Sequence, residues 1–538
     1  MATMTEIPAF TNEAFLDWND PDNVRQMEAA LEALKGEFDR TWPLYIGDRK
    51  ITEGEVDEAR SPWDKDLVIG RTIRATKEQA QEAIGEAERA FETWRRVSWE
   101  ERADYLFRVA DALRRRRFEF AAVMVYEVSK SWTEADADVA ELIDFAEWYA
   151  REALRIGQPQ PVVPYPGERG QLRYVPLGVG AIIPPWNFPG AIMGGMTLAA
   201  IVCGNTVVLK PAHTSTIIAA KFAELLIDEL GLPPGVVNFI PGPGSVIGDT
   251  IVDDTRTRFI AFTGSKEIGM RIFERASKVH DGQIWLKRTI LEMGGKDAIV
   301  ADETADPEEV AQGIVAAAFG FQGQKCSACS RAIIVDAIYD EVLEKVVAGA
   351  KRLTQGEPTS KDNFMGAVID RKAFDKISEY IEIGKQEGRL VLGGDPKSPD
   401  ETGGYYIPPT IIADVDPQAR IAQEEIFGPV LAFHRAPDWE TALEWANDTE
   451  FGLTGAFYSR KRERLNHAAD EFHVGNLYLN RKCTGALVGV HPFGGFNMSG
   501  TDSKAGGPDY LLLFTQAKSV AEKVDPSIPT PEGGGLGD

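Results

Sequence analysis

Cysteine is scarce in this chain. Only four cysteines occur among 538 residues, too few for a disulfide framework, so the sequence predicts a protein of the reducing cytoplasm. No run of about 18 consecutive apolar residues is present, which argues against a membrane-spanning helix. The N-terminal stretch MATMTEIPAFTNEAFLDWND lacks the basic and apolar regions of a secretory signal, and we expect no membrane association.

Positive charge is also in short supply. Lysine and arginine total 58 against 83 aspartates and glutamates, which gives a formal net charge of −25. Nucleic acids are bound through basic surfaces, so a general nucleic-acid role is excluded. A solvated acidic surface explains the charge, although a local basic pocket for an anionic small molecule stays open. The length predicts more than one domain.

The N-terminal part of the chain is helical in pattern. Residues 1–45 predict an amphipathic helical arm, and further helical stretches cover 76–95 and 99–155. Thr76 is a suitable N-cap for the first of these stretches. The RRRR run at 114–117, in the second, is expected on a solvated face.

Short apolar strands alternate with helices from residue 172 onward. NTVVLKP, GVVNFIPG and RFIAFTGS are strand-like, and the segments between them have helical patterns. Such alternation predicts βαβ units and a parallel sheet. A new set begins after Glu292 and reaches about residue 480, so the sequence predicts a second α/β domain.

Two of the four cysteines, Cys326 and Cys329, form a C-x-x-C within GFQGQKCSACSR. A zinc site needs a second pair of ligands, and Cys203 and Cys483 are isolated, so no metal site is expected. A redox pair would need a thioredoxin-like setting at a helix start. Small neighbours and the adjacent Lys325 favour a nucleophilic Cys326, with a plain buried cysteine as a close alternative.

Several other segments have features of a ligand site. GPGSVIG, with Gly242, and FTGSKEIG each join a strand to a helix, where exposed N–H groups can bind phosphate. Either one alone is equally explained as a turn, but two in one sheet favour a nucleotide pocket. Asn187 in PPWNFPG suits an oxyanion donor or an Asx-turn cap. Glu292 in LEMGGK suits a catalytic or a surface carboxylate.

Seven motifs together resemble the aldehyde dehydrogenase superfamily: PPWNFP, VVLKPA, FTGSKEIG, LEMGGK, GQKCSACSR, EEIFGPV and PFGG, in that order over residues 45–518. The resemblance implies an α/β fold with a Rossmann-type NAD-binding domain, an α/β catalytic domain and a small β oligomerisation flap. The implied division is 1–45 as N-terminal helical arm, 46–160 with 180–290 as NAD-binding domain, 291–485 as catalytic domain, 161–179 with 500–518 as oligomerisation flap, and 519–538 as flexible tail.

The resemblance also implies catalytic roles. Cys326 matches the nucleophile, Glu292 the base that activates water, and Asn187 with the Cys326 N–H the oxyanion hole, whereas Cys329 is a bystander. The cofactor implied is NAD. NADP is also expected to be tolerated, because His213 stands where many relatives carry glutamate. The cofactor contacts implied are Ile183, Pro184, Trp186, Lys210, His213, Gly242, Phe262, Ser265, Glu425 and Phe427.

Three longer stretches, GFQGQKCSACSR, EFHVGNLYLNRKCTGALVG and SGTDSKAGGPDYL, resemble the branch of this superfamily that oxidises L-glutamate γ-semialdehyde in proline degradation. The resemblance implies a small-molecule substrate and a homo-oligomer, either a dimer or built from dimers. Lys325, Ser327, Gly485 and Ala486 would anchor the substrate α-carboxylate, and Phe188 and Phe493 would flank its aliphatic chain. Succinate semialdehyde is an alternative substrate, and a catalytically silent homologue is an alternative class.

Overall fold

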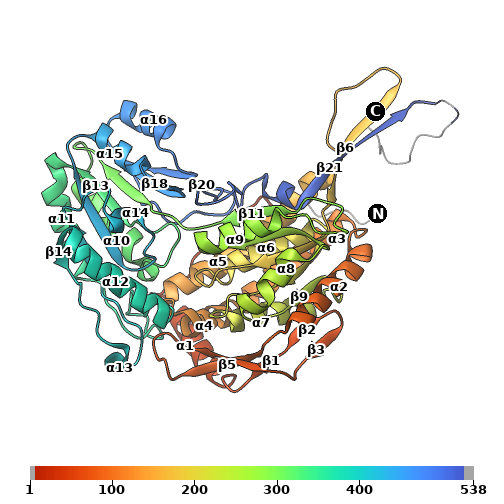
Figure 1. Cartoon of the computed structure of the whole chain (residues 1–538), viewed down its shortest axis with the longest axis horizontal. Coiled ribbons are helices and arrows are strands. Elements are labelled where there is room, and N and C mark those ends of the chain that lie inside the picture. Colours follow the sequence, from red (N-terminus) through yellow and green to blue (C-terminus); the bar gives the residue numbers. More distant parts are fainter. Residues whose placement is uncertain (1–6, 526, 528–538) are drawn as a thin grey trace.

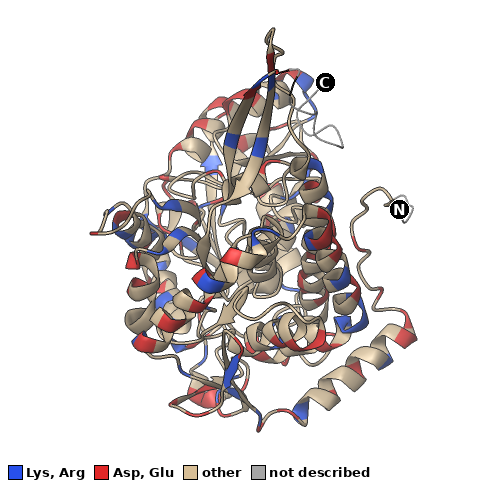
Figure 2. Cartoon of the chain, turned by 90° about the vertical axis from the view of Figure 1, so that its right-hand side faces the viewer, with Lys and Arg blue, Asp and Glu red and all other residues tan. Residues whose placement is uncertain are grey.

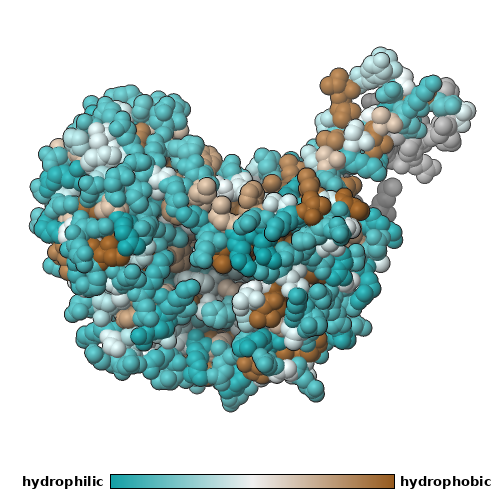
Figure 3. Space-filling model, in the orientation of Figure 1, coloured by the Kyte–Doolittle hydropathy of each residue, from teal (hydrophilic) through white to brown (hydrophobic). Residues whose placement is uncertain are grey.

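The computed structural model describes residues 7–525 and residue 527. Two α/β lobes lie side by side, and a two-stranded antiparallel sheet projects from the larger one (Figure 1). The surface between the lobes is hollowed (Figure 3), where β11 (Arg288–Glu292) and β20 (Phe496–Asn497) lie in Figure 1. The predicted site residues come from both lobes, so this hollow is where they can meet.

The larger lobe contains a seven-stranded sheet in the order β11-β10-β7-β8-β9-β2-β3. The strands other than β11 are β10 (Thr257–Thr263), β7 (Val179–Ile183), β8 (Thr206–Leu209), β9 (Val237–Phe239), β2 (Leu44–Ile46) and β3 (Arg49–Ile51). The five strands β11, β10, β7, β8 and β9 are parallel to one another. At one edge of the sheet, β2 pairs antiparallel with β9, and β3 pairs antiparallel with β2. The chain order reverses between β7 and β10, and ligands bind at such a switch point in open parallel sheets.

Helices cover both faces of this sheet. One face carries α2 (Lys77–Trp94), the π turn η2 (Gly244–Gly248), α8 (Asp249–Asp253) and α9 (Lys266–Ala276). The π turn η1 (Leu225–Glu229) continues α7 and packs on the opposite face. The other face carries α3 (Trp99–Arg115), α4 (Arg117–Val128), α5 (Trp132–Gly157), α6 (Ala191–Val202) and α7 (Thr216–Glu224). Thr76 caps α2 through a capping box, as predicted.

The arginine run at 114–117 is not wholly solvated. Arg117 is buried, and its Nε donates to Asp136 Oδ1 at 2.6 Å. A kink separates α3 from α4 at Arg116 and turns Arg117 inward. A helical pattern does not reveal such a break.

The smaller lobe contains a sheet in the order β14-β15-β16-β13-β12-β18-β19, parallel except for β14. Its strands are β14 (Arg389–Leu392), β15 (Thr410–Ala413), β16 (Val430–Ala436), β13 (Arg331–Val335), β12 (Ala298–Ala301), β18 (Thr454–Tyr458) and β19 (Asn476–Leu479). Its helices are α10 (Pro307–Phe319), η3 (Gly320–Gly323), α11 (Asp336–Ala350), α12 (Arg371–Glu387), α13 (Pro399–Thr402), α14 (Arg420–Gln423), α15 (Trp439–Asn447) and α16 (Arg462–Glu471).

Smaller elements complete the fold. β1 (Thr41–Trp42), β5 (Val68–Ile73) and β4 (Val56–Arg60) form a small sheet, and β17 (Phe451–Gly452) pairs with β20. η4 (Tyr510–Phe514) leads into β21 (Thr515–Lys523). β21 pairs antiparallel with β6 (Glu168–Pro176) to make the projecting two-stranded sheet. β21 therefore continues past residue 519, where the flexible tail was predicted to begin; residues 528–538 lie outside the described residues.

The N-terminal segment is less helical than predicted. Only α1 (Pro21–Lys35) is a helix, with a proline at its start and an Asp20 cap. Residues 7–17 have no regular secondary structure and follow the surface of the larger lobe. The first six residues of the predicted arm lie outside the described residues.

Candidate active site

The carboxyl edge of the larger sheet brings predicted residues together. Ile183 ends β7, Lys210 follows β8, Gly242 follows β9, Ser265 follows β10, and Glu292 ends β11. Parallel strands end on the same side of a sheet, so residues far apart in sequence share this edge. Ile183 and Ser265 flank the switch point between β7 and β10.

Lys210 lies within the larger lobe. Only 7 % of it is exposed, burial lowers its pKa to about 8, and its Nζ donates to Pro211 O at 3.0 Å. A Cβ added to Gly244 would lie 4.0 Å from Lys210 Cε, so this cation lies beside the glycine turn. His213 is exposed three residues further on. The pair can present an ammonium group and an imidazole ring to a nucleotide sugar.

Other predicted cofactor residues lie at the first turns of helices. Ser265 caps α9 through its Oγ, which accepts from the N–H of Ile268, and Phe262 is buried in the sheet core. Val246 and Ile268, which the sequence argument missed, keep 45 % and 43 % of their surface exposed. Exposed aliphatic side chains beside such turns are suited to contact a flat ring.

The smaller lobe faces this edge with Glu425 and Phe427. The Phe427 ring lies 5.6 Å from the Trp186 ring, centroid to centroid, in an edge-to-face contact that joins the two lobes. Glu425 Oε1 accepts from the N–H of Gly295 at 3.1 Å, and burial raises the pKa of this carboxyl. Gly294 gives Glu425 room, because a Cβ there would collide with the carboxylate.

Cys326 follows a strained turn. Phe321, Gln322 and Gly323 have φ values of 50°, 56° and 66°, a left-handed conformation that costs free energy at residues other than glycine. Gln322 Nε2 holds the turn in place by donating to the carbonyls of Ser129 at 3.1 Å and Ala367 at 2.8 Å. Strain of this kind is found at functional sites and fixes the direction of the side chains that follow.

The two cysteines of the C-x-x-C lie in different environments, and all four cysteines are free. Cys326 is half-buried and lines a cavity of about 50 Å³, whereas Cys329 is 1 % exposed and belongs to the core of the smaller lobe. Cys329 Sγ is 3.4 Å from Arg331 O. This placement supports the interpretation of Cys329 as a bystander.

The expectation that Lys325 promotes a thiolate is wrong for this structure. Lys325 Nζ forms an ion pair with Glu134 at 2.7 Å, so its charge is directed away from the sulfur. Burial raises the pKa of the Cys326 thiol well above its usual value, and the carboxylates of Asp297, Glu292 and Glu425 raise it further. The thiol must therefore lose its proton before it can attack.

Asn187 is brought to the cysteine turn. It is 4 % exposed, and its Nδ2 donates to Gln324 O at 3.1 Å. The N-cap of α6, the next helix, is Gly190 and not Asn187. An amide donor held two residues from Cys326 fits an oxyanion hole better than the Asx-turn alternative.

Glu292 is a buried carboxylate, not a surface one. Its Oε1 accepts from Ser503 Oγ at 2.6 Å, and its Oε2 accepts from the N–H of Gly495 at 3.2 Å. Burial raises its pKa to about 7, against the lowering effect of these hydrogen bonds. Glu292, Cys326 and Phe493 line the same cavity. Such a carboxyl changes its charge near neutral pH, which suits a general base.

Ser503 was missed from sequence because it belongs to no catalytic motif. We expect Ser503→Ala to raise the pKa of Glu292 above about 7, because the hydroxyl donates to the charged form. A general base must be ionised to accept a proton, so turnover that depends on Glu292 as a base should be slower at pH 7 in the variant and recover at higher pH. A pH–rate profile of steady-state turnover measures this shift.

Thr501→Val is the matched control for that variant, because Thr501 Oγ1 bonds the backbone of Leu291 and not the Glu292 carboxylate. Its profile should keep the wild-type midpoint. An unshifted midpoint in Ser503→Ala would refute the role given to this hydroxyl.

Of the predicted substrate residues, Phe493 lines the Cys326 cavity, and Phe188 lies beside two lysines. The ring of Phe188 has Lys130 Nζ 4.0 Å and Lys325 Nζ 6.0 Å from its centroid. Lys130 is fully buried and ion-paired with Asp138 at 2.7 Å. Ser327 is half-buried in the cysteine turn. Lys130 lies in the connection between α4 and α5, and Glu134 lies in the first turn of α5. Neither belongs to a recognised motif, so only the fold places them here.

Gly485 and Ala486 lie in a loop after β19. Gly485 is exposed with φ +82°, and Ala486 is half-buried. Arg481 holds the loop by donating to the carbonyl oxygens of Thr484 and Gly485, both at 3.0 Å. Because Arg481 occupies the carbonyl oxygens of Thr484 and Gly485, this loop can present the N–H groups of Gly485 and Ala486 to an anion.

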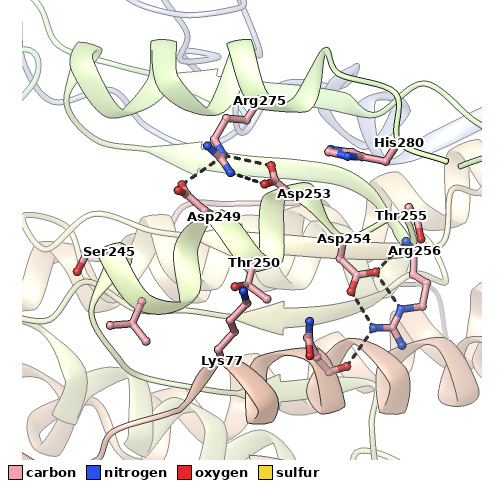
Figure 4. A pocket seen from close by; sticks show the side chains of 12 residues that line it. Lys77, Ser245, Asp249, Thr250, Asp253, Asp254, Thr255, Arg256, Arg275 and His280 are labelled. Atoms are coloured by element: carbon pink, nitrogen blue, oxygen red, sulfur yellow. Dashed lines mark hydrogen bonds and ion pairs between the residues drawn. The ribbon is translucent and has the colours of Figure 1, made fainter.

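A separate cavity lies elsewhere. It has a volume of about 670 Å³ and lies on the outer side of the larger lobe between α2, α8 and α9 (Figure 4). Its charged groups mostly pair with one another, as Arg275 does with Asp253 and Arg256 with Asp254. Within the described ranges there is no helix able to cross a membrane and no cluster of side chains able to hold a metal ion.

Comparison with known proteins settles the family. The model of the aldehyde dehydrogenase family matches residues 51–520. The chain belongs to this family. Proteins named 1-pyrroline-5-carboxylate dehydrogenase from Geobacillus sp. (strain WCH70) and Geobacillus thermodenitrificans are 56 % and 57 % identical to it, over 96 % of this chain and 99 % of each relative.

Solved structures of the aldehyde dehydrogenase fold agree. A 1-pyrroline-5-carboxylate dehydrogenase from Thermus with bound NAD superimposes with a TM-score of 0.94 at 50 % identity, covering 97 % of this chain and 100 % of that one. Betaine aldehyde dehydrogenase from Staphylococcus aureus, in complex with NAD⁺, gives 0.86 at 27 % identity, covering 94 % and 98 %. The predicted fold class, with its Rossmann-type and α/β catalytic parts, is confirmed.

Proposed function

We propose that this protein oxidises L-glutamate γ-semialdehyde, the open form of 1-pyrroline-5-carboxylate, to L-glutamate with NAD. The observation that supports this most is the convergence of Cys326 and Glu292 on one cavity, with Asn187 held at the same turn. The names of the relatives, more than half identical over nearly the whole chain, support the substrate. An NADH-absorbance assay with pyrroline-5-carboxylate tests the proposal, and no NADH formation would contradict it.

The residues at the carboxyl edge fit a dinucleotide. Lys210 and the Gly242 turn offer a cation and backbone N–H groups, and Ser265 opens a helix whose N-terminus favours phosphate. Trp186, with Glu425 and Phe427, would hold the nicotinamide end, where the two lobes meet. NAD, when bound, supplies the hydride acceptor.

The chemistry at Cys326 follows from its neighbours. The thiolate of Cys326 adds to the aldehyde carbon, and Asn187 donates a hydrogen bond to the oxyanion. Loss of a hydride from the former aldehyde carbon, which bound NAD would accept, would leave a thioester on Cys326. Glu292 then accepts a proton from water, and the water cleaves the thioester to release the acid.

The charge around the cavity suits an amino acid. Lys325 offers a cation to the substrate carboxylate, and its partner Glu134 offers an acceptor to the substrate ammonium group. Burial alone would raise the pKa of Glu134, but the charges of Lys325 and Lys130 lower it, so the pair is ionised. This is a local ionic site within a protein of net charge −25.

We expect a strong preference for glutamate γ-semialdehyde over an aldehyde of similar length without the amino acid head. A lost hydrogen bond to a charged group costs about 1.5–3 kcal/mol, so two unpaired groups predict a preference of roughly 10²-fold or more in kcat/KM. Steady-state kinetics with both aldehydes measure the preference, and Lys325→Ala should reduce it. Equal values for the two substrates would exclude this assignment; a preference for succinate semialdehyde would favour that alternative.

We expect NAD to be preferred and NADP to be used more slowly. His213 is exposed and has no carboxylate to repel a 2′-phosphate, and Lys210 lies nearby. His213→Glu should therefore depress NADP turnover selectively. The measurement is kcat/KM for both cofactors, with His467→Glu on the distant helix α16 as a charge-matched control. An absence of NADP turnover in the wild type would refute the prediction.

We further propose a homo-oligomer in the cytoplasm. The two-stranded sheet of β6 and β21 projects from the larger lobe (Figure 1). Val163 and Tyr165, just before β6 in the chain, are 91 % and 70 % exposed. A projecting edge with exposed apolar residues favours pairing with a second copy. Sedimentation of the intact protein against a Val163→Asp, Tyr165→Asp variant tests the association.

A further inference from the structure

The N-terminal segment, residues 7–19, lies along the outside of the larger lobe. It precedes α1 and runs up the side of the protein in extended form, as Figure 2 shows from α1 to the N label. It contacts α5 along much of that helix and reaches the loop that contains Gly485 and Ala486. No catalytic residue lies within this segment.

Specific contacts anchor the segment to α5. The N–H of Glu13 donates to Asp144 Oδ1 at 2.7 Å, and the N–H of Leu16 donates to Asp136 Oδ2 at 2.8 Å. The Trp18 ring packs edge-to-face on Trp132, with 5.2 Å between centroids. Polar and aromatic contacts at separate points predict a defined path for the segment.

Asn12 joins α5 to the loop. Its Nδ2 donates to Asp144 Oδ2 at 2.8 Å and to the carbonyl oxygen of Val488 at 2.9 Å, so both N–H bonds of the amide are used. Asp144 and Val488 are each only 4 % exposed. One half-buried side-chain amide thus links helix and loop.

The segment also packs on the same loop beside Asn12. A Cβ added to Gly489, whose φ is +75°, would lie 3.1 Å from both the Phe10 and the Trp148 rings. Phe10 and Trp148 themselves pack edge-to-face with 5.2 Å between centroids. On its other side, Gly489 donates its N–H to Gly506 O at 2.9 Å. The loop is therefore held between the N-terminal segment and the body.

The near end of the loop is built to present N–H groups. Arg481 occupies the carbonyl oxygens of Thr484 and Gly485. Among the residues that the structure describes, neither the N–H of Gly485 nor that of Ala486 has a hydrogen-bond partner. Their direction depends on where the loop is fixed, and Val488, two residues beyond Ala486, is one such point.

We propose that Asn12 is a positioning residue for the substrate carboxylate: by fixing Val488 against α5, it aims the N–H groups of Gly485 and Ala486 into the site. The inference rests on the proposed function, in which these groups bind the α-carboxylate of glutamate γ-semialdehyde. Asn12 touches neither substrate nor cofactor. Its effect is therefore on substrate affinity and not on the chemical steps at Cys326.

The test compares Asn12→Ala with wild type on two substrates. We expect the KM for glutamate γ-semialdehyde to rise about fivefold, from the loss of one to two hydrogen bonds, with kcat nearly unchanged. KM and kcat for propanal, which has no carboxylate, should stay at wild-type values, as should the affinity for NAD. Asn19→Ala is the matched control, because Asn19 Nδ2 bonds only the nearby Asp17 within the same segment.

Asn12→Asp gives a second variant that removes both donations without shrinking the side chain. It places a carboxylate against Asp144 and should raise the same KM at least as much. An equal rise in KM for propanal and for glutamate γ-semialdehyde would overturn the proposal. An unchanged KM for glutamate γ-semialdehyde would also overturn it, as would a loss of NAD binding in both variants. Failure of the proposed function is distinct, because the wild type itself would then not turn over glutamate γ-semialdehyde.

Discussion

Cys326→Ala is expected to abolish NADH formation, with a loss of roughly 10⁴-fold or more, as for other nucleophiles whose covalent step cannot be bypassed. The methyl group cannot form a bond to the aldehyde carbon, and no other sulfur lies in a position to replace it. Cys329 and Cys483 are buried in the core of the smaller lobe, and Cys203 is in that of the larger. The measurement is initial NADH absorbance at saturating aldehyde and NAD.

Cys329→Ala is the matched control for this loss. Its sulfur is buried beside Arg331 O, so the variant should lose some stability through a small cavity and keep most of its turnover. Thermal unfolding of both variants separates the effects, because Cys326→Ala should remain folded while inactive. Loss of turnover in Cys329→Ala at a temperature where it is folded would restore the redox-pair interpretation.

Glu292→Gln is expected to separate oxidation from hydrolysis. The amide cannot accept a proton from water, so thioester cleavage should slow by about 10²–10⁴-fold. The Cys326 thiolate should form no less readily in this variant, because the Glu292 carboxylate is among the groups that raise the pKa of Cys326. Stopped-flow absorbance should therefore show a burst of NADH near one per active site, followed by a stall.

The pH dependence gives an independent check on the same residue. The pKa of Glu292 is about 7, raised by burial, and only its ionised form can act as a base. Hydrolysis in the wild type should therefore increase as pH rises through about 7. The rate of the slow phase in Glu292→Gln should not show this increase with pH. A variant with unchanged steady-state turnover would exclude Glu292 as the base.

The motifs allowed much of the fold to be predicted, because they lie where strands end. Lys210, Gly242 and Ser265 each follow a strand of one sheet, and parallel strands bring their carboxyl ends to one edge. Thr76 and its capping box likewise marked the start of α2. Local patterns of this kind depend on neighbours in the chain, which the sequence contains.

Long-range contacts could not be predicted in the same way. Glu134 lies on α5, far from Lys325 in the chain, and its ion pair occupies the charge that was expected to favour the Cys326 thiolate. Ser503 likewise reaches Glu292 only through the fold. The assigned roles of the site residues and the domain boundaries remain predictions. Asn12 lay in an arm predicted as helix, and its contacts exist because that part is extended.

The most direct test of the account is to identify the covalent intermediate. Glu292→Gln, mixed with glutamate γ-semialdehyde and NAD and quenched in acid, should carry one glutamyl group per chain. Peptide mass spectrometry should locate this group on Cys326, with NADH released in equal amount. A glutamyl group on Cys329, or NADH released without any adduct in a variant that has stalled, would contradict the proposed mechanism.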